Sequence, residues 1–378
     1  MPRSLQFPTG SRTLLLALAS FACAAPSTKA GATVDDLSTL LEPYRADGGL
    51  PALAAAVFRD GELIAQGATG VRKLGDATRA TTADQWHLGS ETKAMTATLA
   101  GLYVDRGKIR FEDTVASLFT GETIDPGYAA VTVEQLLRHR GGAPGVMPDD
   151  IWSRMWADGA APGARLKAVR SLLSRPPAQP PGQFVYANAG YMIVGTALER
   201  IAGTTWEQLI QTELLAPLHM DGCGFGPPGT PGQVDQPWAH QTYGSQLLPV
   251  GPGPQADNPP SLGPAGTVHC PLASWGKFLS MHVAGARGGA TLLSPATMQR
   301  LHTPPSGADY AGGWIVTPRN WAGGLALTHA GSNTLWYAVT WLAPAKNVAF
   351  AVVTNCANAA APGTVDQVFG PLIERYSP

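Results

Sequence analysis

The chain has 378 residues, and its 27 Asp and Glu against 26 Lys and Arg side chains give a formal net charge of −1. A balance this even predicts no surface for nucleic acid or another polyanion. Hydrophobic residues, at 44%, can bury a large core and exclude disorder throughout, while 44 Gly and 33 Pro predict a folded, loop-rich protein.

The start of the chain has the pattern of a secretion signal. Two arginines precede the apolar run 14–22, and small residues follow it. The run is shorter than the roughly 18 apolar residues that a membrane span needs. We therefore predict a cleavable signal peptide over 1–30 and a secreted or periplasmic protein without a membrane span. Cleavage after Ala24 or Ala30 fits the pattern, and a lipoprotein anchored through Cys23 is the less favoured alternative.

Three cysteines remain after the signal peptide: Cys223, Cys270 and Cys356. They allow one disulfide at most within a chain, so the fold does not depend on a disulfide framework. The sequence leaves open which pair, if any, is bonded.

Strand and helix patterns follow one another along the mature chain. Residues 53–72 alternate around the turn Asp60-Gly61, which predicts a β-hairpin. Apolar residues at helical spacing predict a helix that begins near Ser90 and ends before Gly107. Further helices are predicted at 132–139, 165–174, 189–202, 205–215, 271–284 and 364–376, and strands at 311–316, 325–329, 336–342 and 348–354.

A segment of unusual composition lies between the central helices and the last strands. Residues 226–264 contain 17 Gly or Pro among 39, which predicts a long irregular loop whose role stays open. Strands are predicted at both ends of the chain and helices between them. The simplest architecture is one sheet built from residues 31–90 and 266–378, with a helical domain, 91–265, inserted between its two parts.

Several common catalytic patterns are absent. None of the eight His belongs to a His-x-His or His-Glu-x-x-His pattern, so the sequence predicts no metal site. The Gly-x-Ser-x-Gly elbow, the phosphate-binding loop and the dinucleotide-binding glycine pattern are also missing. The sequence therefore predicts no cofactor and disfavours the common esterase fold.

Two segments have a serine three residues before a lysine: Ser90 with Lys93, and Ser274 with Lys277. This spacing places both side chains on one face of a helix, where a lysine of lowered pKa can take the serine proton. The first pair also stands at a predicted helix start, where free backbone N–H groups suit a developing oxyanion. The spacing alone does not decide between the two pairs.

Two shorter patterns carry less information. The single Tyr-x-Asn, from Tyr186 to Asn188, fits either a proton relay beside the lysine or a loop tyrosine followed by a helix-capping asparagine. His-x-Gly occurs at His87, His139 and His329, and only the last of these ends a predicted strand.

Taken in the order Ser-x-x-Lys, Tyr-x-Asn and His-x-Gly, the chain resembles the penicillin-recognising serine hydrolases over about residues 33–375. These include β-lactamases, D-alanyl-D-alanine carboxypeptidases, D-aminopeptidases and β-lactamase-like esterases. The resemblance implies an α+β fold of the β-lactamase/transpeptidase type. In that fold a mainly antiparallel sheet flanked by helices meets an inserted all-helical domain, and the site lies in the groove between them.

The resemblance also implies roles, residue by residue. Ser90 is the nucleophile and Lys93 its base. Tyr186 protonates the leaving group and later activates the deacylating water, Asn188 orients the substrate amide, and His329 stands where most members have a lysine. Because an unperturbed histidine has a pKa of about 6.5, His329 is expected to govern an acid limb of the activity.

The remaining implied contacts come from the same motifs. The backbone N–H groups of Ser90 and Ser332 form the oxyanion hole, and Ala330, Gly331 and Asn333 contact the substrate. Many members have threonine where this chain has Ala330, so a hydroxyl that binds a substrate carboxylate is missing.

A second departure lies at residues 138–142, which read Arg-His-Arg-Gly-Gly where the family often reads His-Thr-Ser-Gly. Whether Arg138 or Arg140 replaces the lost carboxylate contact stays open. The sequence predicts a secreted serine hydrolase that acts through an acyl-enzyme on a small-molecule or peptide ester or amide, with weak β-lactam hydrolysis. The alternative is a penicillin-binding receptor or a silent binding scaffold of the same fold, and the oligomeric state is left open.

Overall fold

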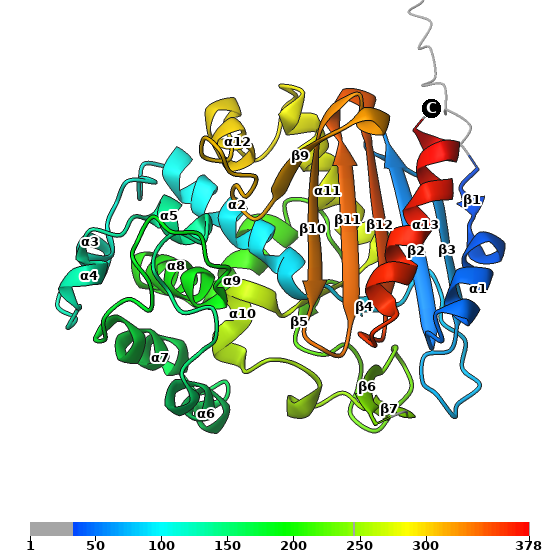
Figure 1. Ribbon diagram of the computed structural model, residues 1–378, viewed down its shortest axis with the longest axis horizontal. Helices are drawn as coiled ribbons and strands as arrows, with labels where there is room; N and C mark the ends of the chain where they lie inside the picture. Colours follow the sequence, from blue (N-terminus) through cyan, green and yellow to red (C-terminus); the bar gives the residue numbers. More distant parts are fainter. Residues whose placement is uncertain (1–32, 245, 378) are drawn as a thin grey trace, which may run out of the picture. The chain divides into compact units, whose positions relative to one another are not determined.

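The largest sheet in the structure, a computed structural model that describes residues 33–244 and 246–377, has seven strands (Figure 1). In order across the sheet its strands are β1 (Asp35–Asp36), β3 (Glu62–Gly70), β2 (Ala52–Arg59), β12 (Val348–Thr354), β11 (Tyr337–Ala343), β10 (Gly324–Ser332) and β9 (Ile315–Arg319). All neighbours are antiparallel except β1 and β3. The predicted signal peptide, 1–30, lies outside the described residues.

The sheet is assembled from both ends of the chain. The predicted hairpin is confirmed: β2 and β3 are joined at Asp60-Gly61, where both residues have positive φ. Strand β2 pairs with the C-terminal strand β12, and Ala56 lies opposite Ala351. The sheet is therefore mainly antiparallel, as predicted, and its centre needs both ends of the chain.

Helices cover both faces of the sheet and fill the space beside it. They are α1 (Ser38–Asp47), α2 (Thr92–Asp105), α3 (Val115–Leu118), α4 (Pro126–Ala129), α5 (Val133–Leu137), α6 (Asp149–Asp158), α7 (Ala164–Leu173), α8 (Asn188–Ala202), α9 (Trp206–Ile210), α10 (Gly263–Gly266), α11 (Leu272–Ala286), α12 (Pro295–His302) and α13 (Ala361–Tyr376). Shorter helical turns are η1 (Gly89–Glu91), η2 (Gln211–Leu215), η3 (Pro254–Ala256), η4 (Pro260–Leu262), η5 (Asn320–Ala322) and η6 (Pro344–Lys346). Figure 1 shows α1 and α13 over one face of the sheet, and α3 to α9 grouped beside its β9 and β10 edge, with α2 in between.

Alternation along the central strands divides the core in two. On β2, Leu53 and Val57 belong to the cluster with α1 and α13, whereas Ala56 and Phe58 belong to the larger cluster that includes α11. Strand β12 is buried at every position, because each of its two faces packs against one of these clusters. A strand with both faces covered is apolar throughout, which explains the continuous apolar run near the C-terminus.

The Pro/Gly-rich segment, residues 226–264, is more regular than predicted. It holds two paired strands, β6 (Ala239–Tyr243) and β7 (Gln246–Val250), followed by η3 and η4. Just outside it, β5 (Gly224–Phe225) and β4 (Gln85–His87) flank β8 (Val268–Pro271) in a small sheet. The segment predicted as a helical insertion, 91–265, thus carries short strands in addition to helices. Their Pro and Gly content masks the local strand signal.

One disulfide joins Cys223 to Cys270, and Cys356 is a buried thiol. This answers the pairing question that the sequence left open. Cys270 lies on β8, opposite Trp86 of β4, so the bond braces the small sheet that leads into Ser90.

From Val34 onward the chain forms one compact unit, and the predicted division into a sheet domain and a helical domain stays a prediction. Within the described part of the chain, no helix combines the length and the apolar character of a membrane span. Over the same residues, no three His, Cys, Asp or Glu side chains gather where they could hold a metal ion.

Candidate active site

The first serine–lysine pair lies at the start of a buried helix. Ser90 is in the turn η1, and Lys93 is in the first turn of α2, which is buried along most of its length. Lys93 Nζ donates hydrogen bonds to Ser90 Oγ at 2.8 Å and to the Ala265 carbonyl at 2.7 Å. Lys93 is fully buried, and this desolvation lowers its pKa well below the usual value. A neutral Lys93 can accept the proton of the Ser90 hydroxyl.

The second serine–lysine pair does not form. Ser274 Oγ donates to the Asp221 carbonyl at 2.6 Å, and Lys277 Nζ donates to the His219 carbonyl. Both side chains tie α11 to the chain that follows η2. The structure thus separates two segments whose spacing is identical in the sequence.

Tyr186 lies over the same lysine. Its ring centroid is 4.9 Å from Lys93 Nζ, and 38% of the residue is exposed. Desolvation raises the pKa of the phenol, and a hydrogen bond with Ser90 opposes this rise only in part. The phenol therefore keeps its proton at neutral pH and is available as a proton donor beside the serine.

His139 holds the segment that carries Tyr186. Its carbonyl accepts from the Val185 N–H at 2.9 Å, and its Nδ1 accepts from the Ala187 N–H at 3.0 Å. The two rings pack with centroids 4.2 Å apart. Burial lowers the pKa of His139 to about 2. Nδ1 therefore stays unprotonated and keeps its acceptor role.

His329 lies on β10 with Tyr310 beside it. Its Nδ1 is 2.7 Å from the Ala330 carbonyl, and its Nε2 is 3.0 Å from the Tyr310 hydroxyl. Because a carbonyl only accepts, Nδ1 carries the proton and Nε2 accepts from Tyr310. Burial and the neighbouring Lys93 lower the pKa of His329 to about 3. This lowered pKa argues against the expectation that His329 governs an acid limb of the activity, which stays a prediction.

Two glycines let the turn of the nucleophile and the end of β10 come together. A Cβ on Gly331 would lie 1.9 Å from the Leu88 carbonyl oxygen. One on Gly89, whose φ is +51, would lie 2.4 Å from the Ser332 nitrogen. Only glycine fits at these positions. The backbones of Ser90 and Ser332 thus run side by side, as an oxyanion hole made from their N–H groups requires.

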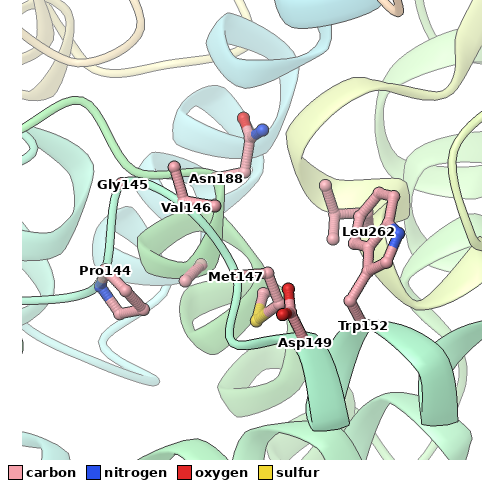
Figure 2. Close-up of a pocket in the computed structure, with 9 residues that line it drawn as sticks. Pro144, Gly145, Val146, Met147, Asp149, Trp152, Asn188 and Leu262 are labelled. Carbon is pink, nitrogen blue, oxygen red and sulfur yellow. The ribbon is translucent and has the colours of Figure 1, made fainter.

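A cavity of about 250 Å³ opens beside Asn188, the first residue of α8 (Figure 2). The residues that line it are mostly apolar: Pro144, Gly145, Val146, Met147, Asp149, Trp152, Asn188, Ala189 and Leu262. Figure 2 shows Trp152 and Leu262 on one side and Val146 and Pro144 on the other. Asn188 therefore borders a mostly apolar pocket.

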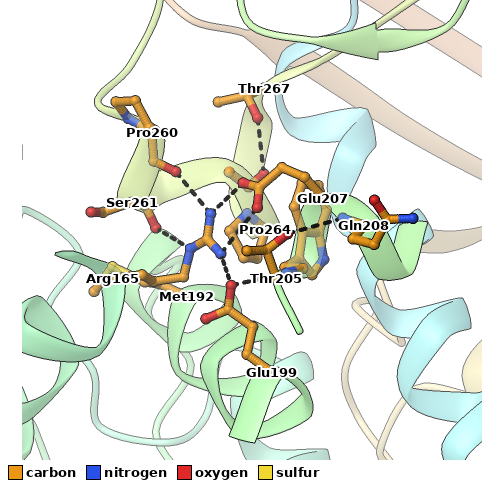
Figure 3. A network of polar contacts seen from close by, with 12 residues as sticks. Arg165, Met192, Glu199, Thr205, Glu207, Gln208, Pro260, Ser261, Pro264 and Thr267 are labelled. Atoms are coloured by element: carbon orange, nitrogen blue, oxygen red, sulfur yellow. Dashed lines mark hydrogen bonds and ion pairs between the residues drawn. The ribbon is translucent and has the colours of Figure 1, made fainter. Parts of the chain in front are cut away.

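The carbonyl that binds Lys93 is held by a buried ionic network (Figure 3). Arg165 is 8% exposed and lies at its centre. Its partners are the carbonyls of Pro260 and Ser261, both at 3.0 Å, and the carboxylates of Glu199 and Glu207. These contacts fix η4 against α7 and α8. Because η4 leads directly into α10, they also fix the Ala265 carbonyl that accepts from Lys93.

A family model for Beta-lactamase matches residues 37–369. The chain belongs to the beta-lactamase family. The match spans most of the described residues and includes each of the three sequence motifs. The predicted resemblance is confirmed, and so is the β-lactamase/transpeptidase-like fold.

Known members of the beta-lactamase family resemble the chain at moderate identity. Penicillin-binding protein 4 of Amycolatopsis lactamdurans is 26% identical over 333 residues, covering 83% of each protein. A putative D-alanyl-D-alanine carboxypeptidase of Escherichia coli O157:H7 is 25% identical over 217 residues, which cover 53% of this chain and 49% of that protein. The octameric penicillin-binding protein homologue from Pyrococcus abyssi has a similar structure, with a TM-score of 0.72 and 20% identity over 90% of this chain and 78% of that one. This beta-lactamase-family chain is therefore serine hydrolase-like.

Some of the predicted binding groups turn away from the serine. The Asn333 side chain is buried and donates to Asp257, although the sequence had assigned it to the substrate. Arg138 and Arg140 each donate to backbone carbonyls. Ala330 is exposed on β10, where its methyl group offers no hydrogen bond. Whether either arginine replaces the missing hydroxyl stays open.

Four residues to which the sequence gave no role lie near Ser90, Lys93 or Tyr186: Glu91, His139, Tyr191 and Tyr310. The ring of Tyr191 lies 5.6 Å from Lys93 Nζ. Glu91 is 1% exposed, and among the described residues its carboxyl oxygens have no hydrogen-bond partner of good geometry. Glu91 and Tyr191 are adjacent to known motifs and could have been found there, whereas Tyr310 carries no sequence signal.

Proposed function

We propose that this chain is a serine hydrolase that forms an acyl-enzyme on Ser90 and acts on esters or amides. The observation that carries the proposal is the 2.8 Å contact between Ser90 Oγ and the buried Nζ of Lys93. Desolvation holds the pKa of this lysine low, so the amine is able to take the hydroxyl proton. That transfer turns the serine into a nucleophile.

Acylation begins when Lys93 takes the Ser90 proton and Oγ bonds to the substrate carbonyl carbon. The oxyanion lies against the backbone N–H groups of Ser90 and Ser332, a type of contact worth about 10²–10³ in kcat. Tyr186 then gives its proton to the leaving group and is reprotonated by Lys93. The C–O or C–N bond breaks, and the acyl group stays on Ser90.

Deacylation repeats these steps with water in place of the leaving group. Lys93, neutral again, is the proton acceptor: Tyr186 takes a proton from the water that attacks the acyl carbon and passes its own proton to Lys93. The proton returns to Ser90 Oγ as the acid departs. His329 stays neutral throughout, because its pKa is about 3, and it supports the site through Tyr310.

The proposed substrate class rests on the cavity beside Asn188 and on the side chain of Ala330. The cavity beside Asn188 is lined mostly by apolar side chains and suits an uncharged, apolar group on the substrate. Ala330 supplies no hydroxyl for a carboxylate. We propose small esters and neutral amides or peptides as substrates, with weak turnover of β-lactams. The names of the penicillin-binding and carboxypeptidase relatives support amide chemistry.

We also propose that the protein is secreted or periplasmic. The disulfide between Cys223 and Cys270 supports this, because such bonds persist in oxidising compartments and are rare in the cytosol. The predicted signal peptide over 1–30 points the same way.

Labelling with a fluorophosphonate and turnover of p-nitrophenyl acetate test the function. We expect the wild-type protein to be labelled and to turn over the ester. Ser90→Ala should lose the label and at least about 10³ in kcat. Ser274→Ala is the matched control, and it should keep both activities because Ser274 bonds only to the Asp221 carbonyl.

Two results would redirect the proposal. A label retained in Ser90→Ala would remove Ser90 as nucleophile. A stoichiometric burst without further turnover in the wild-type protein would instead identify a penicillin-binding receptor that is acylated once.

A further inference from the structure

A buried polar chain links the two backbones of the proposed oxyanion hole. Asp257 follows η3 and lies between His87 of β4 and Asn333, the residue after β10. Its Oδ2 is 2.8 Å from His87 Nε2, off the ideal hydrogen-bond direction, and its Oδ1 accepts from Asn333 Nδ2 at 3.1 Å. None of the three is more than 8% exposed. The carboxylate thus joins segments that are far apart in the sequence.

Each end of this chain is tied to a backbone of the oxyanion hole. On one side, His87 Nδ1 accepts from the Gly89 N–H at 3.1 Å, one residue before Ser90. On the other side, Asn333 Oδ1 accepts from the backbone N–H groups of Leu335 and Trp336, at 3.2 and 3.1 Å. The second set of bonds fixes the turn that follows Ser332. A shift of Asp257 would therefore move both backbones.

The positions of the protons on His87 and Asn333 make the Asp257 carboxylate essential to this series of polar contacts. Because His87 Nδ1 accepts a backbone N–H, its proton lies on Nε2 and faces Asp257. Asp257 Oδ1 also accepts from the Asn258 N–H at 2.6 Å. His269 lies opposite His87 on β8 and is neutral at ordinary pH, because burial lowers its pKa to about 4. Asp257 therefore presents a carboxylate oxygen to both sides, which an amide could do on one side only.

We propose that Asp257 is a positioning residue that holds the Ser90 and Ser332 N–H groups at the separation that binds the oxyanion. This inference rests on the proposed acyl transfer at Ser90. It also gives the Pro/Gly-rich segment a part in the reaction, through contacts with His87 and Asn333. Asp257 acts through these two side chains and not through the substrate. Its contribution is therefore to the binding of the tetrahedral state.

The test compares Asp257→Ala and Asp257→Asn with Asp235→Asn in the full chain. Asp235 is the matched control because it lies in the same segment and its carboxylate binds Thr230. The measurements are kcat/KM for p-nitrophenyl acetate, the inhibition constant of phenylboronic acid and the melting temperature. Phenylboronic acid forms a tetrahedral adduct on a nucleophilic serine, so its affinity reports on the oxyanion hole and not on folding alone.

We expect Asp257→Ala to lower kcat/KM by about 100-fold and to weaken phenylboronic acid by a similar factor. Asp257→Asn keeps the acceptor for Asn333 and loses the one for His87, so both losses should be smaller, about tenfold. Asp235→Asn should match the wild-type protein. If Asp257→Ala does not fold, the comparison between Asp257→Asn and Asp235→Asn decides.

The inference is overturned if Asp257→Asn keeps wild-type kcat/KM and phenylboronic acid affinity, even if its melting temperature falls. A structural role alone would give that pattern. If the wild-type protein is not labelled at Ser90, the proposed function fails and this inference fails with it. Ser90-dependent labelling together with unchanged Asp257 variants would overturn the inference alone.

Discussion

His139 packs against Tyr186 with ring centroids 4.2 Å apart, and its Nδ1 holds the N–H of the residue that follows this tyrosine. His139 itself has a φ of 55°, in the left-handed region. The residue at this position must adopt a positive φ, and its side chain must also supply an atom that accepts a hydrogen bond. Together they make His139 the anchor of the phenol beside Ser90.

We expect His139→Ala to lower kcat/KM at least tenfold. The loss of a buried hydrogen bond costs about 1–3 kcal/mol, and alanine tolerates a positive φ poorly. His139→Asn should retain more activity, because asparagine adopts this conformation more readily and its amide oxygen can accept the Ala187 N–H. Steady-state kinetics with a small ester check both variants. Equal activity in all three proteins would contradict the anchoring role.

The acid limb of kcat/KM should belong to Lys93 and not to His329. Desolvation lowers the pKa of Lys93, so the amine charges as the pH falls through that lowered value and can no longer accept the Ser90 proton. His329, with a pKa of about 3, does not change charge in the usual range. His329→Gln should therefore leave the midpoint of the acid limb in place. A pH profile measured from pH 4 to 10 checks this, and a midpoint that moves by more than about one pH unit would contradict it.

Glu91→Gln should stabilise the protein, and the gain should grow with pH. Desolvation raises the pKa of Glu91 well above its usual value, and the nearby backbone of Thr340 opposes this only weakly. A raised folded-state pKa means that the contribution of Glu91 to stability is full below about pH 4.5 and is lost as the pH rises through the folded-state value. Glutamine has no such loss. Urea unfolding at pH 4 and pH 8 tests this, and a gain that shrinks with rising pH would refute it.

Arg165→Met should lower the free energy of unfolding by about 3–5 kcal/mol, because it leaves Glu199 and Glu207 without their buried partner. The control is Arg175→Met, which breaks an exposed pair with Asp150 and should cost less than about 1 kcal/mol. Tryptophan fluorescence during urea unfolding measures both. Similar losses in the two variants would show that the Arg165 network stabilises the fold no more than an exposed ion pair does.

Ala330→Thr should shift the substrate preference towards carboxylates. A hydrogen bond to a charged group contributes about 1.5–3 kcal/mol, so kcat/KM for a β-lactam should rise about tenfold relative to an uncharged ester. The ratio of the two rates, measured on the same preparation, removes errors in active-site concentration. A wild-type kcat/KM for β-lactams above about 10⁶ M⁻¹s⁻¹ would show that another group already binds the carboxylate.

The parts of the fold that were predictable are those with a local signal. The hairpin at Asp60-Gly61 follows from alternation and turn chemistry, and the helix at Ser90 follows from apolar spacing. The strand predicted at 311–316 begins only at Ile315, because Gly312 and Gly313 interrupt the run. Local patterns fix the type of an element more firmly than its ends.

The site was predictable only where its chemistry lies within a short motif. Ser90 and Lys93 are three residues apart, but Ser274 and Lys277 share that spacing, and only the tertiary neighbours separate the two pairs. His139 accepts from a backbone N–H 48 residues away in the sequence, and Asp257 accepts from a side chain 76 residues away. Such a long-range hydrogen bond produces no recognisable spacing in the sequence, because any residue with an acceptor atom could supply it.

The disulfide between Cys223 and Cys270 closes a loop over a sequence separation of 47 residues, and this loop contains the whole Pro/Gly-rich segment. Closing a loop of that length removes conformational freedom from the unfolded chain and favours folding by about 4 kcal/mol. Asp257, Ser261 and Ala265 all lie inside it, so their order depends on the oxidation state of two sulfur atoms outside the site. Protein produced in a reducing cytoplasm would contain the same sheet and the same Ser90, yet a less firmly held Lys93 acceptor. The compartment in which the protein is expressed should therefore affect its measured activity.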